Sequence, residues 1–280
     1  MWEKHFIQTQ RGTFEVFING VGTPLAVTHL YSAFDERGNH FANAFTEDYQ
    51  VYLINLRGAG ESVGVEKEEQ YSMEEAVLDL EAIRETLDFD RWAFAGHSAG
   101  GMLGLKYAIV APAALTKIIV GGAAASREYG YDVESIYSEI NPKSARVKEI
   151  MNLLSNADTP QEERQKLGYE WALMSYQSEE LLKKSLNKPN SGKTVGARLD
   201  YFRQVEFPTF DLREELKTVQ VPAHVYAGRY DAQCPFKYGV EIAALLSNST
   251  FTKFDESNHF PFVEEQDKFE EFVKSTIGKA

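Results

Sequence analysis

The sequence predicts an α/β fold in which a mostly parallel central sheet is flanked by helices. The sequence contains several short, continuous apolar runs. Apolar runs without polar alternation are typical of strands that are buried on both faces of a sheet. Helical patterns lie between most of the runs, which favours parallel strands joined by crossover helices over a sandwich or a helix bundle. The short, continuous apolar runs occupy residues 25–28, 51–54, 92–95, 118–120, 224–227 and 250–254.

The predicted elements begin with a hairpin. Residues 5–9 and 13–18 alternate between apolar and polar side chains on either side of a turn, so we expect an antiparallel pair at the sheet edge. Ser72 is a predicted N-cap because Glu75 follows three residues later and an apolar helix face comes next. Further helices are predicted at residues 102–110, 240–246 and 264–273.

The alternation of strands and helices stops between residues 122 and 205. This stretch shows helical periodicity, for example after Pro160, and no convincing strand. We therefore expect a helical cap at 122–205, inserted into an α/β core formed by 1–121 and 206–280. Apolar side chains such as Trp171 and Met174 either line a pocket or only dock the cap on the core, and the sequence leaves both open.

Composition and charge exclude several classes of protein. The chain has 280 residues, 43% of them hydrophobic and 25% charged, as in ordinary folded domains, and its formal net charge is −13. Such a charge repels nucleic acid and anionic membrane surfaces, so we expect neither as a partner. The apolar stretch 102–125 is interrupted by Lys106, Pro112 and Lys117, which argues against a membrane span.

Cysteine use and the first residues indicate a cytoplasmic protein. Cys234 is the only cysteine, so no disulfide within the chain is expected. Residues 1–10 hold no apolar run of signal-peptide length. Because no H-E-x-x-H motif or Cys/His ligand cluster appears, we expect no metal and no cofactor.

The strongest sign of chemistry is the Gly-His-Ser-Ala-Gly segment at residues 96–100, which matches G-x-S-x-G. It lies between a predicted strand and a predicted helix, the context in which a sharp turn exposes a serine nucleophile. Glycine at 96 and 100 avoids collisions with neighbouring backbone, and the helix N-terminus favours negative charge nearby. Ser98 is therefore the predicted nucleophile.

A serine nucleophile needs a base, and the base needs an acid that orients it. His259 follows the strand that ends near residue 254, and Asp231 follows the strand that ends near residue 227. Both therefore fall at the carboxyl ends of strands, where sites in parallel sheets open. Asp255 and Glu256 are weaker candidates for the acid because they lie so close to His259 in sequence.

Three segments together resemble the α/β-hydrolase fold family over nearly the whole chain, the insertion being the least similar part. They are the elbow at 96–100, the Leu-Arg-Gly-Ala-Gly-Glu-Ser segment at 56–62, and residues 228–235. The last is similar to the acid-bearing segment of proline iminopeptidases and related esterases. The family usually has Asp at the position of Asn55, which we interpret as a structural change.

The resemblance also implies an oxyanion hole. Backbone N–H groups of Ala99 and of the loop after the early strand would hold the developing negative charge. His29 aligns with the start of the family's H-G motif, Leu30 stands where Gly is usual, and Tyr31 is the expected second donor. We interpret His29 itself as a structural residue.

These residues predict a serine hydrolase that cleaves a carboxylic ester, or a related acyl bond, of a small molecule. The first alternative is an aminopeptidase like the proline iminopeptidases, which needs cap carboxylates for a free α-amino group. The second alternative is a non-catalytic ligand-binding protein of the same fold. Whether the chain forms a homo-oligomer stays open. The carboxylates available to an aminopeptidase are Glu134, Glu139, Glu170 and Glu206.

Overall fold

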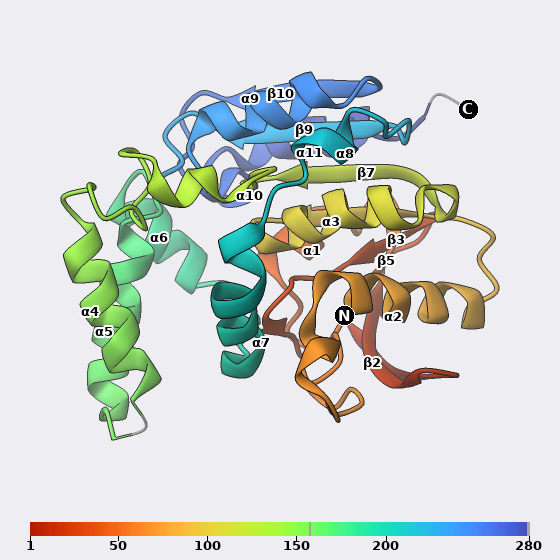
Figure 1. The fold of residues 1–280 in the computed structure, drawn as a ribbon, viewed down its shortest axis with the longest axis horizontal. Coiled ribbons are helices and arrows are strands. Elements are labelled where there is room, and N and C mark those ends of the chain that lie inside the picture. The colour runs from red at the N-terminus through yellow and green to blue at the C-terminus, as the bar shows by residue number, and fades with distance from the viewer. Residues whose placement is uncertain (157, 279–280) are drawn as a thin grey trace.

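The computed structural model describes residues 1–156 and 158–278, and within them eight strands form one sheet in the order β1-β2-β5-β3-β6-β7-β9-β10 (Figure 1). β1 (Glu3–Thr9) and β2 (Gly12–Asn19) form the predicted edge hairpin, and β2 runs antiparallel to β5 (Tyr49–Ile54). All further neighbours in the sheet pair in parallel, which confirms the mostly parallel sheet.

Each predicted central strand is present and slightly longer than its apolar run. Parallel pairing brings the carboxyl ends of these strands to one edge, with His97 opposite Gly121 at the end of β6 and β7. Side chains from the loops after these strands can therefore meet. The strands are β3 (Thr23–Val27), β6 (Trp92–His97), β7 (Leu115–Gly121), β9 (Ala223–Gly228) and β10 (Ser249–Phe254).

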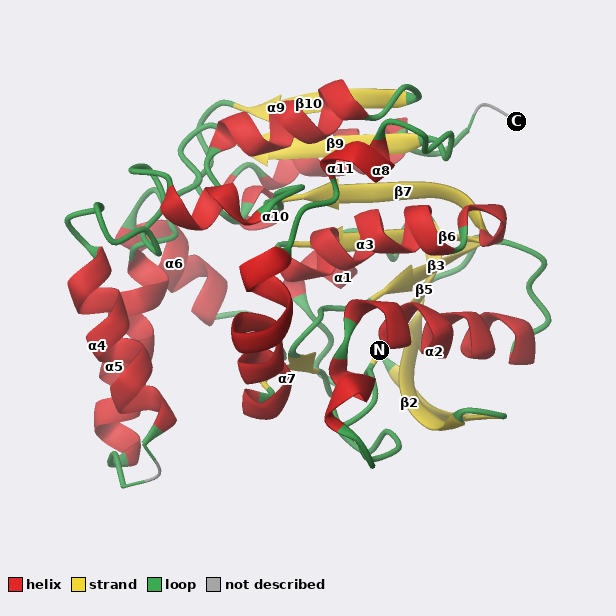
Figure 2. Ribbon diagram, in the orientation of Figure 1, coloured by secondary structure: helices red, strands yellow, loops and turns green. Residues whose placement is uncertain are grey.

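Helices cover both faces of the sheet, as Figure 2 shows. Successive strand residues point to opposite faces, so Phe94 joins the core under α2, α3 and α9, while Ala95 joins the core that contains Phe269 and Phe272. The helices of the first core are α2 (Met73–Thr86), α3 (Ala99–Val110), α8 (Arg213–Leu216) and α9 (Phe236–Leu245). Those of the second are α1 (His40–Asn43), α10 (Pro261–Glu264) and α11 (Gln266–Ser275).

Helix boundaries follow local hydrogen bonding. The predicted N-cap Ser72 accepts a bond from the Glu75 N–H at 3.2 Å. α3 begins at Ala99, directly after the elbow serine. The expected helix 264–273 is instead divided into α10 and α11, because Glu265 leaves the helical conformation at φ −123° and ψ 56°. Its carboxylate accepts from the Ser257 hydroxyl at 2.7 Å, which ties the break to the preceding loop.

Among the described residues, four α-helices lie within residues 122–205, the stretch that we expect to be a cap insertion. α4, α5 and α6 stand together at one end of the molecule, and α7 lies between them and the sheet (Figure 1). They are α4 (Ser144–Ser155), α5 (Gln161–Leu173), α6 (Glu179–Leu186) and α7 (Gly196–Tyr201). The sequence pattern missed a small antiparallel pair, β4 (Ser32–Ala33) with β8 (Lys193–Thr194). In residues 1–156 and 158–278 no helix has the length and apolar character to cross a membrane.

Short helical turns complete the chain. They lie mostly between the longer elements, and the last two continue α7 toward the core. They are η1 (Glu68–Tyr71), η2 (Pro112–Ala114), η3 (Arg127–Tyr131), the π-turn η4 (Phe202–Glu206) and η5 (Phe207–Thr209).

Candidate active site

Ser98 occupies a strained turn between β6 and α3. Its φ of 57° and ψ of −126° lie in a region that residues with a side chain rarely adopt. The turn is held by the Ser98 N–H, which donates to the Gly121 carbonyl at 2.9 Å. The sequence predicted such a strained turn, and strain of this kind clusters at functional sites.

The two elbow glycines have steric causes. A Cβ on Gly96 would overlap the carbonyl oxygen of Gly100, and a Cβ on Gly100 would come within 2.5 Å of the Thr28 carbonyl oxygen. Real Cβ atoms do not approach backbone oxygens that closely. The close approach of strand, turn and helix therefore requires glycine on both sides of the serine.

Asp231 and His259 form a buried pair. The His259 Nδ1 lies 2.9 and 2.8 Å from the two carboxylate oxygens of Asp231, and the residues are 2% and 4% exposed. The carboxylate is itself fixed, because its Oδ1 accepts from the N–H groups of Gln233 and Cys234, both at 2.9 Å. Because carboxylate oxygens accept hydrogen bonds, this contact favours the His259 tautomer with the proton on Nδ1, which leaves Nε2 as an acceptor.

The loop that carries His259 is held from two sides. The His259 N–H donates to the Ser175 carbonyl at 3.1 Å, just beyond α5 in the insertion. The Glu264 carboxylate accepts from the N–H groups of Asn258 at 3.1 Å and Phe260 at 3.0 Å, and from that of Gln177 at 2.8 Å. One backbone bond to Ser175 and three bonds to the Glu264 carboxylate thus fix the segment that carries this histidine and tie it to the stretch after α5.

Ser98 and His259 line one cavity of about 530 Å³. Within residues 1–156 and 158–278 the Ser98 hydroxyl makes no hydrogen bond. Such contacts are often long in ligand-free enzymes and tighten only when substrate binds. The alternative acid Asp255 is exposed and forms an ion pair with Lys253, so the structure brings Asp231 and not Asp255 to the histidine.

His97 packs beside the pair. It is 8% exposed, its ring centroid lies 4.5 Å from that of His259, and its Nδ1 is 2.9 Å from the Tyr226 hydroxyl. Burial, and secondarily the charge of His259, hold the pKa of His97 well below its usual range. The lowered pKa favours the neutral form of the ring, which packs against the aromatic side chains around it.

The predicted oxyanion loop is stabilised around His29. The His29 Nδ1 is 2.9 Å from the Ser32 hydroxyl and accepts a weak bond from the Tyr31 N–H at 3.4 Å. Burial, with smaller effects from the charges of His259 and Arg198, lowers the pKa of His29 to about 3. Tyr31 lines the same cavity as Ser98.

Arg198 on α7 is a site residue that sequence reasoning missed. It is 1% exposed and donates to three carbonyl oxygens, those of Leu30, Arg57 at 2.8 Å and Tyr71 at 3.4 Å. Burial lowers the pKa of its guanidinium to about 10. No local pattern marks this arginine, because its partners lie more than a hundred positions away in the chain.

A second cavity lies next to the one that Ser98 lines, and four of the described residues line both. We call the cavity around Ser98 the first chamber; a second chamber, of about 290 Å³, lies beneath α4, α7 and η3. Tyr31, Tyr137, Trp171 and Thr194 line both. Among the residues that the structure describes, no Asp or Glu lines either chamber.

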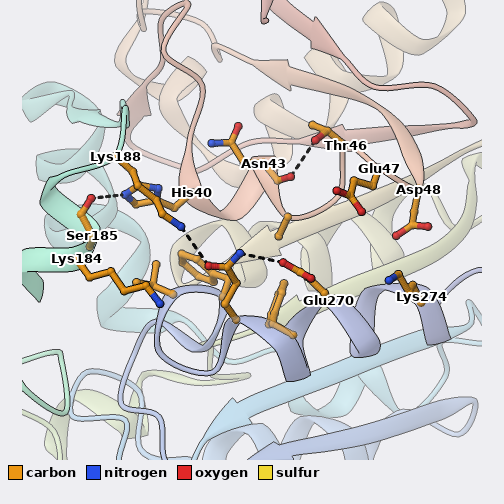
Figure 3. Close-up of a pocket in the computed structure, with 15 residues that line it drawn as sticks. His40, Asn43, Thr46, Glu47, Asp48, Lys184, Ser185, Lys188, Glu270 and Lys274 are labelled. Carbon is orange, nitrogen blue, oxygen red and sulfur yellow. Dashed lines mark hydrogen bonds between the residues drawn. The ribbon is translucent and has the colours of Figure 1, made fainter. Parts of the chain in front are cut away.

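Figure 3 shows a third hollow, of about 230 Å³, between α1, α6 and α11. His40 lines both this hollow and the first chamber, and its Nε2 lies 3.2 Å from the Ser185 carbonyl oxygen. Its other polar side chains mix both signs, including Glu270 and Lys274. In the described parts of the chain no cluster of three or more His, Cys, Asp or Glu could hold a metal.

Asn55 stands where the family usually has Asp, and its role is structural. Its side chain donates to Glu15 at 2.6 Å and to the Phe34 carbonyl at 3.0 Å, and it accepts from the Phe34 N–H at 2.7 Å. It therefore joins β2 to the loop after β4 and lies outside the chemistry.

Comparison with known proteins agrees with this geometry. A family profile described as "alpha/beta hydrolase fold" matches residues 16–266. A solved alpha/beta fold family hydrolase from Bacillus anthracis str. Sterne is 56% identical, with a TM-score of 0.98 over 99% of this chain and 100% of that one.

Two curated proteins show more distant similarity. The AB hydrolase superfamily protein YisY of Bacillus subtilis (strain 168) is 26% identical over 96% of this chain and 97% of its own. A proline iminopeptidase of Saccharolobus solfataricus (strain ATCC 35092 / DSM 1617 / JCM 11322 / P2) is 24% identical over 83% of this chain and 78% of its own. The chain belongs to the alpha/beta hydrolase fold family and is a hydrolase.

Proposed function

We propose that this hydrolase cleaves a carboxylic ester, or a related acyl bond, of a small molecule through a Ser98-His259-Asp231 triad. The observation that carries the proposal is the buried Asp231–His259 pair, whose histidine lines the same cavity as a serine on a strained elbow. The pair supplies an oriented base, and the elbow presents the hydroxyl that the base would activate.

The reaction proceeds in two steps. The Ser98 Oγ attacks the substrate carbonyl carbon while His259 Nε2 takes the hydroxyl proton; the carbon–oxygen bond to the leaving group then breaks, and the same proton passes to that group. Water then attacks the acyl-enzyme while His259 takes one of its protons; the bond from the acyl carbon to Ser98 Oγ breaks, the proton passes from His259 to that oxygen, and the acid and free Ser98 are released. Asp231 stays ionised and stabilises the imidazolium that forms in each step.

The oxyanion that forms in each step needs two donors. The Ala99 N–H follows the nucleophile at the N-terminus of α3, where backbone donors have no partner within the helix. We assign the second donor to the Tyr31 N–H, whose present bond to His29 is weak at 3.4 Å. An oxyanion offers a far stronger acceptor than a neutral imidazole, so the N–H exchanges one partner for the other.

The inserted region shapes the substrate site in this proposal. We assign residues 122–205 as the cap and residues 1–121 and 206–280 as the core. Of the two apolar side chains for which the sequence left both roles open, Trp171 lines both chambers and Met174 lines neither, which favours substrate contact for Trp171 alone. Mostly apolar walls around a few polar groups are typical of pockets for small molecules.

The aminopeptidase alternative receives less support from the geometry. A free α-amino group needs a nearby carboxylate, yet none of the four candidate glutamates lines a chamber. Glu139 pairs with Lys148 at 2.8 Å, Glu170 with Arg146 at 2.6 Å, and Glu206 accepts from the Met73 N–H at 2.8 Å. Glu134 is exposed. The ester reading therefore stands first.

The test is labelling with a fluorophosphonate probe, alongside turnover of 4-nitrophenyl acetate and of proline 4-nitroanilide. We expect the intact chain to label and to cleave the ester, and Ser98→Ala and His259→Ala to lose both. Ser155→Ala, at the end of α4, is the matched control and should behave like the intact chain. Cleavage of the anilide alone would favour the aminopeptidase. A folded chain that neither labels nor turns over any ester would favour the non-catalytic alternative.

Location and partners remain predictions. We propose a cytoplasmic enzyme that acts on a small acyl substrate without a metal or cofactor, and without nucleic acid or membrane as a partner. The charge of −13 supports the last two points, because it disfavours contact with polyanions.

A further inference from the structure

The charge lining of the second chamber is opposite to that of the whole chain. Asp and Glu number 42 against 29 Lys and Arg. Nevertheless the described residues that line the second chamber include Lys148 and Arg203 and no carboxylate. Among the described residues neither chamber is lined by a carboxylate, and only the second is lined by Lys and Arg side chains, which favours a negatively charged occupant there.

The interior of this chamber is aromatic. The ring centroids of Tyr31 and Phe202 lie 6.0 Å apart, and those of Tyr129 and Phe207 lie 5.6 Å apart. Its volume of about 290 Å³ is close to the lower end of ligand pockets, which begin at about 300 Å³. The walls therefore fit a compact aromatic or branched apolar group.

The two cations lie at the edge of the chamber, since both also reach solvent. Lys148 is already occupied by Glu139 at 2.8 Å. In residues 1–156 and 158–278 the Arg203 guanidinium makes no hydrogen bond and no ion pair. Arg203 thus offers a planar donor fork that suits a carboxylate in two parallel bonds.

Arg203 also lies within electrostatic range of the chamber wall. Burial raises the pKa values of the Tyr31 and Tyr137 hydroxyls, and the positive charge of Arg203 opposes both increases. Tyr31 and Tyr137 line the first chamber as well, so the cation lies close to the junction with the Ser98 site.

The junction holds a second polar group without a partner. Trp171 lines both chambers, and its buried indole N–H has no hydrogen-bond acceptor among the described residues. A buried donor without an acceptor raises the free energy of the folded chain. A ligand with an oxygen next to the Trp171 N–H would therefore be favoured.

We propose that the substrate is an ester with a compact aromatic or branched apolar group that fills the second chamber and a carboxylate beyond that group that Arg203 binds. This inference rests on the proposed function, because the ester carbonyl has to lie at Ser98 in the first chamber. Arg203 forms no covalent bond and moves no proton. Arg203 favours substrates that carry a carboxylate at the end away from the ester.

The test uses two pairs of esters, since the chamber can hold either side of the scissile bond. The first pair is phenyl acetate and 4-acetoxybenzoate, with the charge on the leaving group. The second pair is methyl 3-phenylpropanoate and methyl 3-(4-carboxyphenyl)propanoate, with the charge on the acyl group. The measured quantity is the ratio of kcat/KM within each pair, divided by the same ratio for hydrolysis by hydroxide.

We expect the carboxylated member to be preferred by about threefold to tenfold in one pair, as one charge-assisted bond at a partly exposed site provides. The preference should shrink in 0.5 M NaCl, because salt screens exposed charges. Arg203→Gln should abolish the preference, and Arg203→Lys should keep part of it. Arg91→Gln is the matched control, because it removes an exposed arginine that lines neither chamber, and its ratios should equal those of the intact chain.

The outcomes separate this inference from the proposed function. If the neutral esters are hydrolysed and neither pair shows a preference for charge, the inference is wrong while the esterase stands. A preference that survives in Arg203→Gln would also overturn it. If no ester is hydrolysed and Ser98 does not label, both fail together.

Discussion

The guanidinium of Arg198 donates to the carbonyl oxygen of Leu30, which belongs to the same peptide unit as the N–H of Tyr31. Because a peptide unit is planar, a bond that fixes the carbonyl also fixes the direction of the N–H on its other side. The positive guanidinium beside this carbonyl oxygen also polarises the peptide unit, which makes the Tyr31 N–H a stronger donor. A residue of the insertion thereby positions the donor that we assign to the oxyanion.

We expect Arg198→Lys to lower kcat about tenfold while KM changes by less than about twofold, because the donor acts mainly on the transition state. Arg198→Met should in addition lower the free energy of unfolding by about 2–4 kcal/mol, since three buried carbonyls lose a donor. Steady-state kinetics on 4-nitrophenyl acetate and urea unfolding measure the two effects.

Ile242→Ala is the control for stability alone. This α9 residue is 0% exposed and far from the oxyanion loop in the sheet order, so its loss should cost about 2–5 kcal/mol without changing kcat. Equal kcat values for Arg198→Lys and the intact chain would contradict the positioning role.

The choice of the acid can be tested by two neighbouring substitutions. Asp231→Asn should lower kcat by about 10⁴, because an amide no longer holds the tautomer in which His259 Nε2 accepts a proton. Asp255→Asn should leave kcat near that of the intact chain, since Asp255 pairs with Lys253 at the surface. Circular dichroism shows whether both variants are folded. A large loss in Asp255→Asn with little change in Asp231→Asn would reverse the assignment.

Gly96→Ala should destabilise the elbow. Its new methyl group would overlap the Gly100 carbonyl oxygen, and backbone cannot give way as a flexible side chain can. We expect a loss of at least about 3 kcal/mol in the free energy of unfolding, the range of overpacking combined with backbone strain. Gly64→Ala is the comparison, because nothing lies within 4 Å of a Cβ there. Thermal unfolding of both variants gives the difference, and similar Tm values would contradict the steric account.

His29 should make the chain sensitive to acid. Its pKa is lowered to about 3 in the folded chain from an ordinary value of 6.5. The unfolded chain therefore binds a proton near pH 6.5 that the folded chain does not. The stability that this neutral histidine contributes is fully present above pH 6.5 and is lost as the pH falls toward 3. At pH 5 the loss amounts to about 2 kcal/mol.

Substitution isolates this effect from the other titrating groups. In His29→Gln the difference in unfolding free energy between pH 7 and pH 5 should be smaller than in the intact chain by about 2 kcal/mol. His5→Gln removes a histidine whose side chain is 44% exposed, and should keep the difference of the intact chain. Urea unfolding at the two pH values measures it. An unchanged difference in His29→Gln would show that this ring is charged in both states.

Local patterns were enough to predict the strands of the core and to name Ser98, Asp231 and His259 as candidates. A buried strand and a strand–turn–helix junction depend on neighbours in sequence, so residues 92–100 could be interpreted without knowing the rest of the fold. Asp231 and His259 followed from the rule that loops after parallel strands meet. The broken helix at Glu265 escaped prediction, because its cause is a bond between that carboxylate and Ser257.

What the sequence could not give depends on how the insertion lies on the core. Arg198 and Arg203 look like ordinary helix cations until α7 is placed over the oxyanion loop and the second chamber. The glutamates of the insertion could be named but not located, and only their places outside the chambers weaken the aminopeptidase reading. The pairing of β4 with β8 spans two residues on each side, too few to produce a period.

The His259 N–H donates to the Ser175 carbonyl, and the Gln177 N–H donates to the Glu264 carboxylate. These two bonds join the stretch after α5 to the loop that carries His259. A displacement of residues 175–177 would therefore also displace His259, the base in the proposed mechanism. Two hydrogen bonds thus make the position of His259 depend on the stretch that follows α5, which is far from it in sequence.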